Sequence, residues 1–350
     1  MSDLAGQADP EAARSNAPHK DAAIVIPCVN VGALTRKCID VCSRTCPQAE
    51  IIVLADHFDD AIAPPGTTRV VVTGPVTIAA KRNRGARETA RRVIAFIDSD
   101  AYPEARWLDS AVRALDENPQ VGAVAGPNVS PQDEPYSERI VGIALKSAFG
   151  SHNAHYIKRP AAPRLVDNVP TVNLIVRRDE YLAIGGMDER LFGGEDVEFC
   201  ARLVKSGRPI LYRPEILVYH KNRSLPEFIK QRLAYGGFAM ETLLKRIDQT
   251  VDIKMNRTIL ISQLPTAFVL FLLSAPAMAI VPFWAYVWLP VASIYAVTII
   301  AEACRHSERP GDIPGAALAL AVATLAPGIG AISKLIGIMP HFRRFYRNDG

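Results

Sequence analysis

Two acidic residues close an apolar run in the stretch VIAFIDSDAYP, Val93 to Pro103. The run is typical of a buried strand, and Asp98 and Asp100 stand where that strand would end. Side chains two residues apart on an extended chain point to the same side. Hard divalent cations such as Mg²⁺ and Mn²⁺ bind carboxylate oxygens together with substrate phosphates. The pair therefore indicates a metal site or a polar turn, and the tripeptide alone does not separate the two.

A second acidic pair, Glu195 and Asp196, lies in AIGGMDERLFGGEDVEFCARL, Ala183 to Leu203. The apolar residues that follow recur at helical spacing until Gly207, so the pair stands at the N-terminus of a predicted helix. A helix N-terminus favours carboxylates electrostatically, which makes a charged cap one interpretation.

Four apolar, Ile- and Val-rich runs alternate with helix-compatible segments between Asp21 and about Asn128: AAIVIP, EIIVLAD, TRVVVT and RRVIAFIDSD. This alternation predicts βαβ units, and therefore an α/β fold with a mostly parallel central sheet. Ligands of such sheets bind at the carboxyl ends of the strands. Three of the runs end in polar residues suited to that edge, namely Asn30, Asp56 and the pair Asp98 and Asp100.

The charge of the chain argues against a nucleic-acid partner. Forty Lys and Arg against 36 Asp and Glu give a net charge of +4, and the basic residues are spread along the chain. The first predicted strand is followed by CVNVGALTRK, which lacks the G-x-G-x-x-G of a dinucleotide-binding oxidoreductase. Residues 1–20 are polar and rich in Ala and Pro, and we expect a flexible tail there.

The composition changes after about Asn256. No charged residue occurs from Thr258 to Ala301, and one membrane crossing needs about 20 apolar residues. We predict a hairpin of two transmembrane helices over 258–303, turning near Val281-Pro282, with Trp284, Tyr286 and Trp288 as interfacial anchors. A buried soluble hairpin is the alternative.

A third uncharged stretch, Ile313 to Ser333, lies within the remaining segment 304–350, which also carries a basic C-terminus. We expect this stretch to lie in the membrane interface or to re-enter the membrane. The positive-inside rule then places all the flanking basic groups in the cytoplasm: Lys254, Arg257, Arg305, Arg309, Arg343, Arg344 and Arg347.

Five motifs, in order along residues 22–236, resemble the inverting glycosyltransferases of family 2, which have the GT-A fold. They are AAIVIPCVN, EIIVLADHFDD, IAAKRNRGARETARRVIAFIDSD, NLIVRRDEYLAIGGMDERLFGGEDVEFCARL and KQRLAYG. The second motif departs from the family pattern, because Ala55 stands where an Asp is usual and His57-Phe58 where Gly-Ser is usual. The Q-x-x-R-W form of processive enzymes is absent.

The resemblance implies a role for each matching residue. Asp196 would be the catalytic base, with Glu195 and Gly194 on the acceptor side. Asp100 and Asp98 would bind Mg²⁺ or Mn²⁺, and His220 in VYHKN is either a third ligand or a hydrogen-bonded residue at a strand end. The residues implied for the nucleotide sugar are Pro27, Asn30, Asp56, Arg82, Asn83, Asp98 and Arg232, the last against the diphosphate.

SAFGSHNAHYIKRP, VYHKNRSLPEFIKQRLAYG and the apolar tail further resemble the membrane-attached, succinoglycan-type glucosyltransferases of exopolysaccharide assembly. This implies a GT-A domain over 21–240, an interfacial helix or linker over 241–257, and catalysis on the cytoplasmic face of a bacterial inner membrane. The donor would be a nucleotide sugar, and the resemblance to the family makes a UDP-sugar the first expectation. The acceptor would be a saccharide on a polyprenyl diphosphate, with other assembly proteins as partners. A non-catalytic GT-A-like protein that binds glycan or organises an assembly complex is the alternative.

Overall fold

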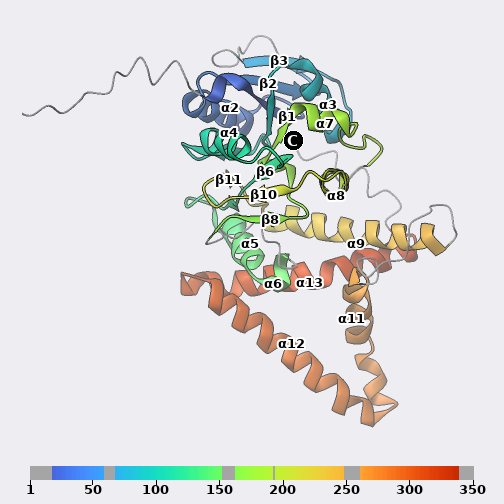
Figure 1. Cartoon of the computed structure of the whole chain (residues 1–350). Coiled ribbons are helices and arrows are strands. Elements are labelled where there is room, and N and C mark those ends of the chain that lie inside the picture. The colour runs from blue at the N-terminus through green and yellow to red at the C-terminus, as the bar shows by residue number, and fades with distance from the viewer. Residues whose placement is uncertain (1–17, 59–67, 152–161, 192–193, 248–260, 339–350) are drawn as a thin grey trace, which may run out of the picture. The chain divides into compact units, whose positions relative to one another are not determined.

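The computed structural model describes residues 18–58, 68–151, 162–191, 194–247 and 261–338 (Figure 1). Its largest feature is an eight-stranded sheet in the order β3-β2-β1-β4-β9-β6-β10-β8. The strands are β1 (Ala22–Cys28), β2 (Glu50–Ala55), β3 (Thr68–Val72), β4 (Val93–Phe96), β6 (Ala123–Ala125), β8 (Arg164–Val166), β9 (Leu174–Arg177) and β10 (Ile210–Tyr212). The four strands predicted from the apolar runs are confirmed, as β1 to β4.

The central sheet is mostly parallel. Strands β1, β2, β3 and β4 pair in parallel, as do β6 and β10, while β9 runs antiparallel between β4 and β6 and β8 forms an antiparallel edge. Parallel strands need crossover connections; α2 (Ala33–Thr45) connects β1 to β2, and α3 (Ile78–Glu88) connects β3 to β4. The carboxyl ends of β1, β2 and β4 consequently lie together at one edge, as the sequence predicts.

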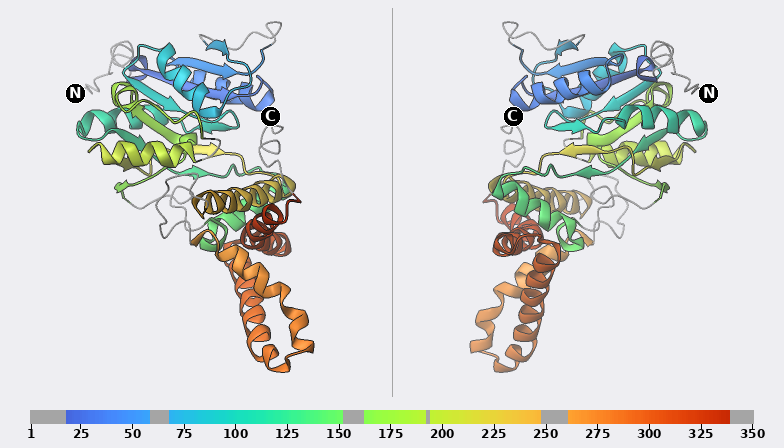
Figure 2. Two further views of the ribbon diagram at one scale, coloured as in Figure 1. Left: turned by 90° about the vertical axis from the view of Figure 1, so that its right-hand side faces the viewer. Right: turned by 90° about the vertical axis from the view of Figure 1, so that its left-hand side faces the viewer.

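Helices cover both faces of this sheet (Figure 2). Alternate residues of β1 belong to two separate cores: Ile24 and Ile26 pack with α2 (Ala33–Thr45) and α4 (Trp107–Glu117). Ala23 and Val25 pack on the other face with α3 (Ile78–Glu88), α7 (Arg178–Ala183) and α8 (Glu195–Lys205). Burial on both faces explains why β1, β2 and β4 are continuous apolar runs with no alternation, whereas the edge strand β3 is only partly buried.

A smaller sheet brings three distant segments together. Its order is β5-β11-β7, with β5 (Ala101–Pro103), β7 (Asn128–Val129) and β11 (Val218–His220). The antiparallel register of β11 on β5 pairs His220 with Ala101. The residue after Asp100 is thereby placed opposite His220, although the two lie more than a hundred positions apart in the sequence.

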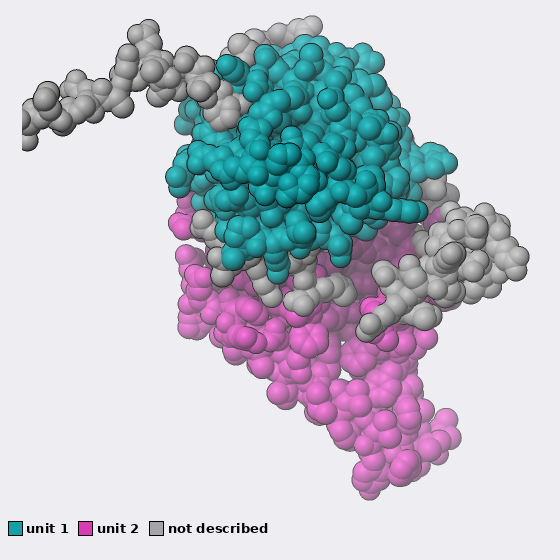
Figure 3. All heavy atoms as spheres, in the orientation of Figure 1, with its two compact units in different colours: residues 1–129, 155–220, 350 teal, residues 130–154, 221–349 magenta. Residues whose placement is uncertain are grey.

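The chain divides into two compact units (Figure 3). Both sheets belong to the first unit, residues 1–129 and 155–220, and the second unit comprises residues 130–154 and 221–349. Segments 130–154 and 221–240 lie inside the predicted catalytic domain, yet they cluster with the C-terminal helices. The physical reason is that their apolar faces are buried against those helices.

The second unit is helical. Its helices are α5 (Tyr136–Lys146), α6 (Ala148–Ser151), α9 (Leu225–Ile247), α11 (Leu264–Leu273), α12 (Ala285–His306) and α13 (Ile313–Leu335). A shared core joins α5, α9, α12 and α13 through Val141, Phe228, Ile299 and Ala319. Because α9 runs unbroken through residue 240, it crosses the predicted boundary between the catalytic domain and the linker.

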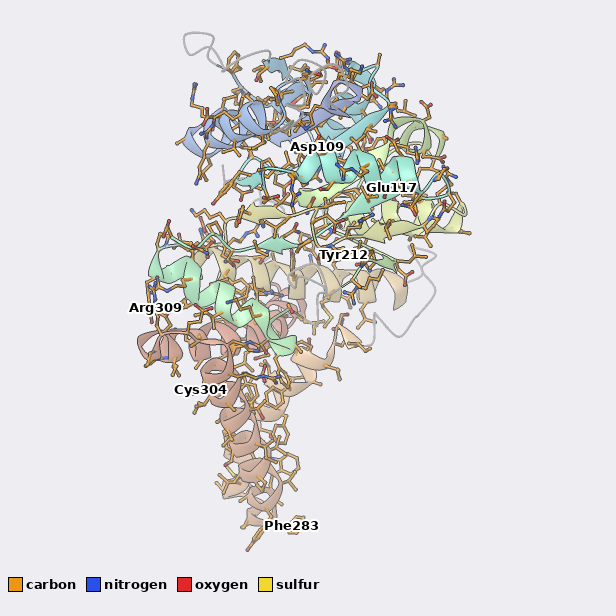
Figure 4. The ribbon with its side chains drawn as sticks, turned by 60° about the vertical axis from the view of Figure 1, so that its left-hand side comes forward. Asp109, Glu117, Tyr212, Phe283, Cys304 and Arg309 are labelled. Atoms are coloured by element: carbon orange, nitrogen blue, oxygen red, sulfur yellow. The ribbon has the colours of Figure 1, made fainter. Side chains whose placement is uncertain are left out.

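Helices α11 and α12 form a hairpin with a turn at residues 280–284, near the predicted Val281-Pro282 (Figure 4). Phe283 lies at the tip, and Cys304 lies at the far end of α12. The indole N–H groups of Trp284 and Trp288 donate to Ser274 Oγ (3.0 Å) and to the Phe271 carbonyl (3.2 Å). These two rings, which we predicted to be membrane anchors, therefore hold the two arms of the hairpin together.

Two of the described helices are long and apolar enough to span a bilayer, judged by length and composition: Pro282–His306 and Pro310–Leu335. The first arm of the hairpin, Leu264–Ala279, is shorter. The second arm thus matches a predicted crossing in length, while residues 258–260 of the first lie outside the described residues. Two crossings over 258–303 stay a prediction.

The close packing of α3 on β1 gives a test of the fold. A Cβ added at Gly85 would lie 2.5 Å from Val25 Cγ1. Because overpacking a core costs about 1–3 kcal/mol, we expect Gly85→Ala to lower the free energy of unfolding by that order. Gly311→Ala is the matched control, since an added Cβ there meets nothing within 4 Å. Urea denaturation measures both, and equal effects would contradict the packing described.

Candidate active site

Three predicted metal ligands meet at the edge of the smaller sheet. Asp98, Asp100 and His220 each offer one ligand atom, and these atoms all lie within 4.8 Å of one another. The His220 Nε2 atom is 3.3 Å from Asp100 Oδ1. The two carboxylate oxygens are ligands that suit Mn²⁺ or Mg²⁺, the imidazole nitrogen can serve as a third metal ligand, and all three residues are half-buried. The other interpretation of His220, a hydrogen-bonded histidine at a strand end, fits the same contact between His220 Nε2 and Asp100 Oδ1.

A buried arginine joins the two acidic pairs. Arg82 of α3 is 2% exposed, and its guanidinium contacts Asp98 Oδ1 at 2.7 Å and Glu195 Oε1 at 3.0 Å. Glu195 is the first residue of α8 and is itself buried. The sequence places Arg82 in the nucleotide pocket, and the structure gives it a protein-internal position between the D-x-D strand and the Glu-Asp helix.

Asp196 lies in the first turn of α8, after Gly194, whose φ of 80° is left-handed and suits glycine. Its Oδ1 accepts a hydrogen bond from the Val197 N–H at 2.8 Å. Burial raises the pKa of the Asp196 carboxyl above its ordinary value, and the negative charge of Glu195 raises it further, while Arg82 lowers it. A carboxylate whose pKa is raised in this way binds a proton more strongly, which is a useful property in a general base.

Asp56 and Lys81 form an ion pair at the carboxyl end of β2. Lys81 is 5% exposed, and its Nζ also donates to the Cys28 carbonyl at 2.5 Å, at the end of β1. Sequence reasoning missed this lysine. A signal was available, because Lys81 immediately precedes Arg82 on the face of α3 that packs against the sheet.

Asn83 holds the turn that leads toward α8. Its Oδ1 accepts from the Tyr181 hydroxyl (2.5 Å) and the Met187 N–H (2.9 Å), and its amide donates to the Met187 carbonyl and to Glu189. All the hydrogen-bonding capacity of the side chain is thus used within the protein. The predicted nucleotide contact of Asn83 stays a prediction, and the hydrogen bonds that the structure gives it are structural.

The remaining predicted residues are not brought to this cluster by any contact described. Pro27 is buried within β1, and Asn30 is exposed two residues after that strand. Arg232 belongs to α9 in the second unit, where its guanidinium donates to the Gly150 carbonyl at 3.0 Å and stacks on Phe228. The acceptor-loop candidates His152 and His155 lie outside the described residues, as do Lys254, Arg257, Arg343, Arg344 and Arg347.

A mostly parallel sheet with acidic side chains gathered at its strand ends defines the class of protein: a GT-A fold, as in nucleotide-sugar transferases. The sequence model of the family described as "Glycosyltransferase like family 2" matches residues 18–236. This match covers more than half of the chain, and the chain belongs to glycosyltransferase family 2.

Individual relatives are distant. A pre-mycofactocin glycosyltransferase of Mycobacterium tuberculosis is 28% identical over 255 residues, which is 69% of this chain and 52% of that protein. A glucosyl-dolichyl phosphate glucuronosyltransferase of Haloferax volcanii is 27% identical over 159 residues, covering 41% of this chain and 47% of that protein. The chain therefore spans about half the length of these curated relatives.

One solved structure shares the fold over most of its length. The mannosyltransferase PcManGT of Pyrobaculum calidifontis, in complex with GDP-Man and Mn²⁺, superposes with a TM-score of 0.54 at 17% identity. The alignment covers 90% of this chain and 87% of that one. At this identity the likeness shows the fold alone.

The bridge through Arg82 predicts a large effect on stability. Removing one partner of a buried ion pair leaves the other charge uncompensated and costs about 3–5 kcal/mol, so Arg82→Met should destabilise the fold by roughly that amount. Arg44→Met is the matched control, because Arg44 pairs with Asp40 on the exposed surface of α2. That change should cost under about 1 kcal/mol. Chemical denaturation measures both, and an Arg82 effect as small as the control would contradict the bridge.

Proposed function

We propose that this chain is a metal-dependent, inverting glycosyltransferase that moves a sugar from a nucleotide-sugar donor to a hydroxyl of a lipid-linked saccharide. One observation carries the proposal: the carboxylates of the D-x-D strand and of the Glu-Asp helix share a single buried guanidinium, that of Arg82. A candidate metal site and a candidate base are thereby held in one unit of the fold.

On the donor side, Asp98, Asp100 and His220 would hold Mn²⁺ or Mg²⁺. When bound, the ion supplies charge stabilisation to the leaving diphosphate. Asp56, paired with Lys81, and Asn30 end two neighbouring strands, β2 and β1, and are proposed to contact the nucleoside. A UDP-sugar is the first donor to test. A GDP-sugar is the second, because the solved relative contains GDP-Man.

On the acceptor side, Asp196 is proposed to take the proton of the attacking hydroxyl. One base and one displacement on the face opposite the leaving group imply inversion at the anomeric carbon. Two features of the residue support this role. Its pKa is raised, as a base requires, and it stands next to Glu195, which is fixed by its ion pair with Arg82.

The lipid-linked acceptor is inferred from the second unit. Two helices there are long and apolar enough to enter a membrane, and a relative's name includes a dolichyl phosphate. We propose attachment to the cytoplasmic face of a bacterial inner membrane, and a polyprenyl-diphosphate saccharide of exopolysaccharide or cell-surface glycan assembly as acceptor. Arg232 of α9 is proposed as a diphosphate contact.

Replacing Asp196 by Asn tests the base directly. An amide accepts no proton, so transfer should fall by at least about 100-fold, while titration calorimetry should still detect UDP or GDP binding in the presence of Mn²⁺. Asp100→Ala is the complementary variant and should lose the Mn²⁺ dependence of that binding. Full turnover by Asp196→Asn would refute the assignment. Absence of metal-dependent nucleotide binding in the wild type would favour the non-catalytic alternative.

The raised pKa of Asp196 predicts the acid limb of the pH profile. Since the base must be deprotonated, kcat/KM should rise with pH through a pKa above the ordinary Asp value of about 3.9. Glu195→Gln removes the neighbouring negative charge that raises this pKa. The acid limb should therefore move to lower pH in that variant, measured at saturating Mn²⁺. A limb that stays in place or moves upward would contradict the assignment.

A further inference from the structure

Helix α13 presents two chemically different faces. Apart from Leu320, the buried face is built of small residues and one proline: Gly315, Ala316, Ala319, Ala323, Ala326, Pro327, Gly328, Gly330 and Ala331. The other face carries large aliphatic residues at intervals of three and four, with Leu318, Ile329 and Ile336 exposed and Val322, Leu325 and Ile332 half-buried. Half of the most apolar stretch of α13 is buried, whereas only 11% of the corresponding stretch of α12 is buried. The two apolar helices therefore have different environments.

The small-residue face of α13 packs directly on α9. A Cβ added at Gly236 of α9 would lie 1.7 Å from the Pro327 carbonyl oxygen, and one added at Gly330 would lie 2.0 Å from the Leu233 carbonyl oxygen. Both distances are shorter than any real contact, so the two backbones touch. Figure 1 shows the two helices side by side. Whatever orientation α9 takes in a membrane, α13 shares it.

Charged and polar residues prevent α9 from spanning a membrane. Glu227, Lys230, Arg232 and Glu241 are distributed along it, whereas a spanning helix needs about 20 predominantly apolar residues. A charge near the bilayer centre costs several kcal/mol. Since α13 lies against α9, this cost argues against a transverse orientation for both helices.

The two ends of α13 are tied to the same layer of helices. Asp312, just before α13, forms a two-bonded ion pair with Arg139 of α5, with both distances at 2.9 Å. Lys334, near the other end, lies 3.4 Å from Glu241 of α9. At 1.5 Å per residue these ends are roughly 33 Å apart. A crossing by α13 would place one of these ion pairs on each side of the bilayer, and α9, which carries Glu241 and the other charges named above, would have to cross beside it.

The neighbouring hairpin indicates what covers the aliphatic face. No charged residue occurs from Leu264 to Ala301, and the α11–α12 hairpin exposes apolar side chains such as Leu273 (64%) in α11, Ile280 (84%) in the turn and Ile294 (66%) in α12. This hairpin extends from the layer formed by α5, α9 and α13 (Figure 2). Hydrocarbon that surrounds the hairpin would continue to the exposed face of α13.

We propose that α13 lies in the plane of the membrane surface without crossing it. Its aliphatic face would lie among the acyl chains, and its small-residue face packs against α9. The inference rests on the proposed membrane attachment and adds its geometry. Polar α9 is held at a fixed height above the acyl chains, and the α11–α12 hairpin is the part that enters deeply. The occupant of the aliphatic face is lipid, which covers the apolar face of a helix that lies in the membrane interface.

Depth-dependent quenching tests the proposal. Single cysteines are introduced as Leu318→Cys, Ile329→Cys and Ile336→Cys in a Cys304→Ser background, since Cys304 is the exposed cysteine among those described. Each is labelled with an environment-sensitive fluorophore in the full chain, reconstituted in phosphatidylglycerol and phosphatidylethanolamine vesicles. Lipids brominated near the headgroup or deep in the acyl chain then report depth. Ile280→Cys, in the turn of the hairpin, and Lys205→Cys, at an exposed position of α8, are the controls.

An in-plane helix predicts one common, shallow depth for the three labels, with no quenching at Lys205→Cys. A crossing helix instead predicts a label at Ile329→Cys much deeper than those at the two ends, and this would overturn the proposal. Quenching only at Ile280→Cys would also overturn it, because protein would then cover the aliphatic face. Absence of quenching everywhere would remove the membrane attachment itself. Metal-dependent nucleotide binding, measured on the same samples, separates that outcome from a failure of the catalytic proposal.

Discussion

The guanidinium of Arg82 is the interaction on which the candidate site depends. It is almost completely buried and contacts one carboxylate from each acidic pair, so the D-x-D strand end and the N-terminus of α8 are held within reach of one cation. Without that cation, Asp98 and the buried Glu195 would be like charges facing each other in a medium of low polarity, where repulsion is strong. The arrangement also affects Asp196, whose pKa reflects burial, Glu195 and Arg82 together.

Beneath this ion pair lies a framework of ordinary packing. The apolar residues of β1 belong to two cores, one on each face of the sheet. Helix α3 packs so closely on β1 that Gly85 has no room for a side chain. This approach places Lys81 beside Asp56 and Arg82 beside Asp98. Asn83 then fixes the Gly186-Met187 turn through a saturated set of hydrogen bonds. Three consecutive residues of α3 thus contact the end of β2, the D-x-D segment after β4 and the turn before α8. The charged site is therefore built on a rigid helix.

The second unit follows a different principle. Its helices pack through small residues, with backbone contacts between α9 and α13, and ion pairs tie the ends of α13 to α5 and α9. Close packing of this kind is common where helices associate without a hydrophobic driving force between them. The same unit carries the polar α9 and the uncharged hairpin. Under the proposed membrane attachment, one compact body would connect an aqueous surface to lipid.

Much of this could be predicted from the sequence, because it depends on patterns local in the chain. Uninterrupted apolar runs predicted β1, β2 and β4, since strands covered on both faces have no polar side, and the Val-rich run TRVVVT predicted the partly buried edge strand β3. The ordered motifs predicted the family. The 44 uncharged residues of Thr258–Ala301 predicted a hairpin turning near Val281.

The tertiary structure decided what depends on pairing between distant segments. Only the register of β11 on β5 brings His220 to Asp100, and only the packing of α3 places Arg82 between Asp98 and Glu195. The division into two units could not be predicted from the sequence either. Helices α5 and α9 belong to the second unit because they are buried against the C-terminal helices, and this packing is not visible in the sequence. Local patterns determine which face of an element is apolar. The partner that covers that face is selected by the whole chain, because burial and charge compensation are satisfied only between elements already folded.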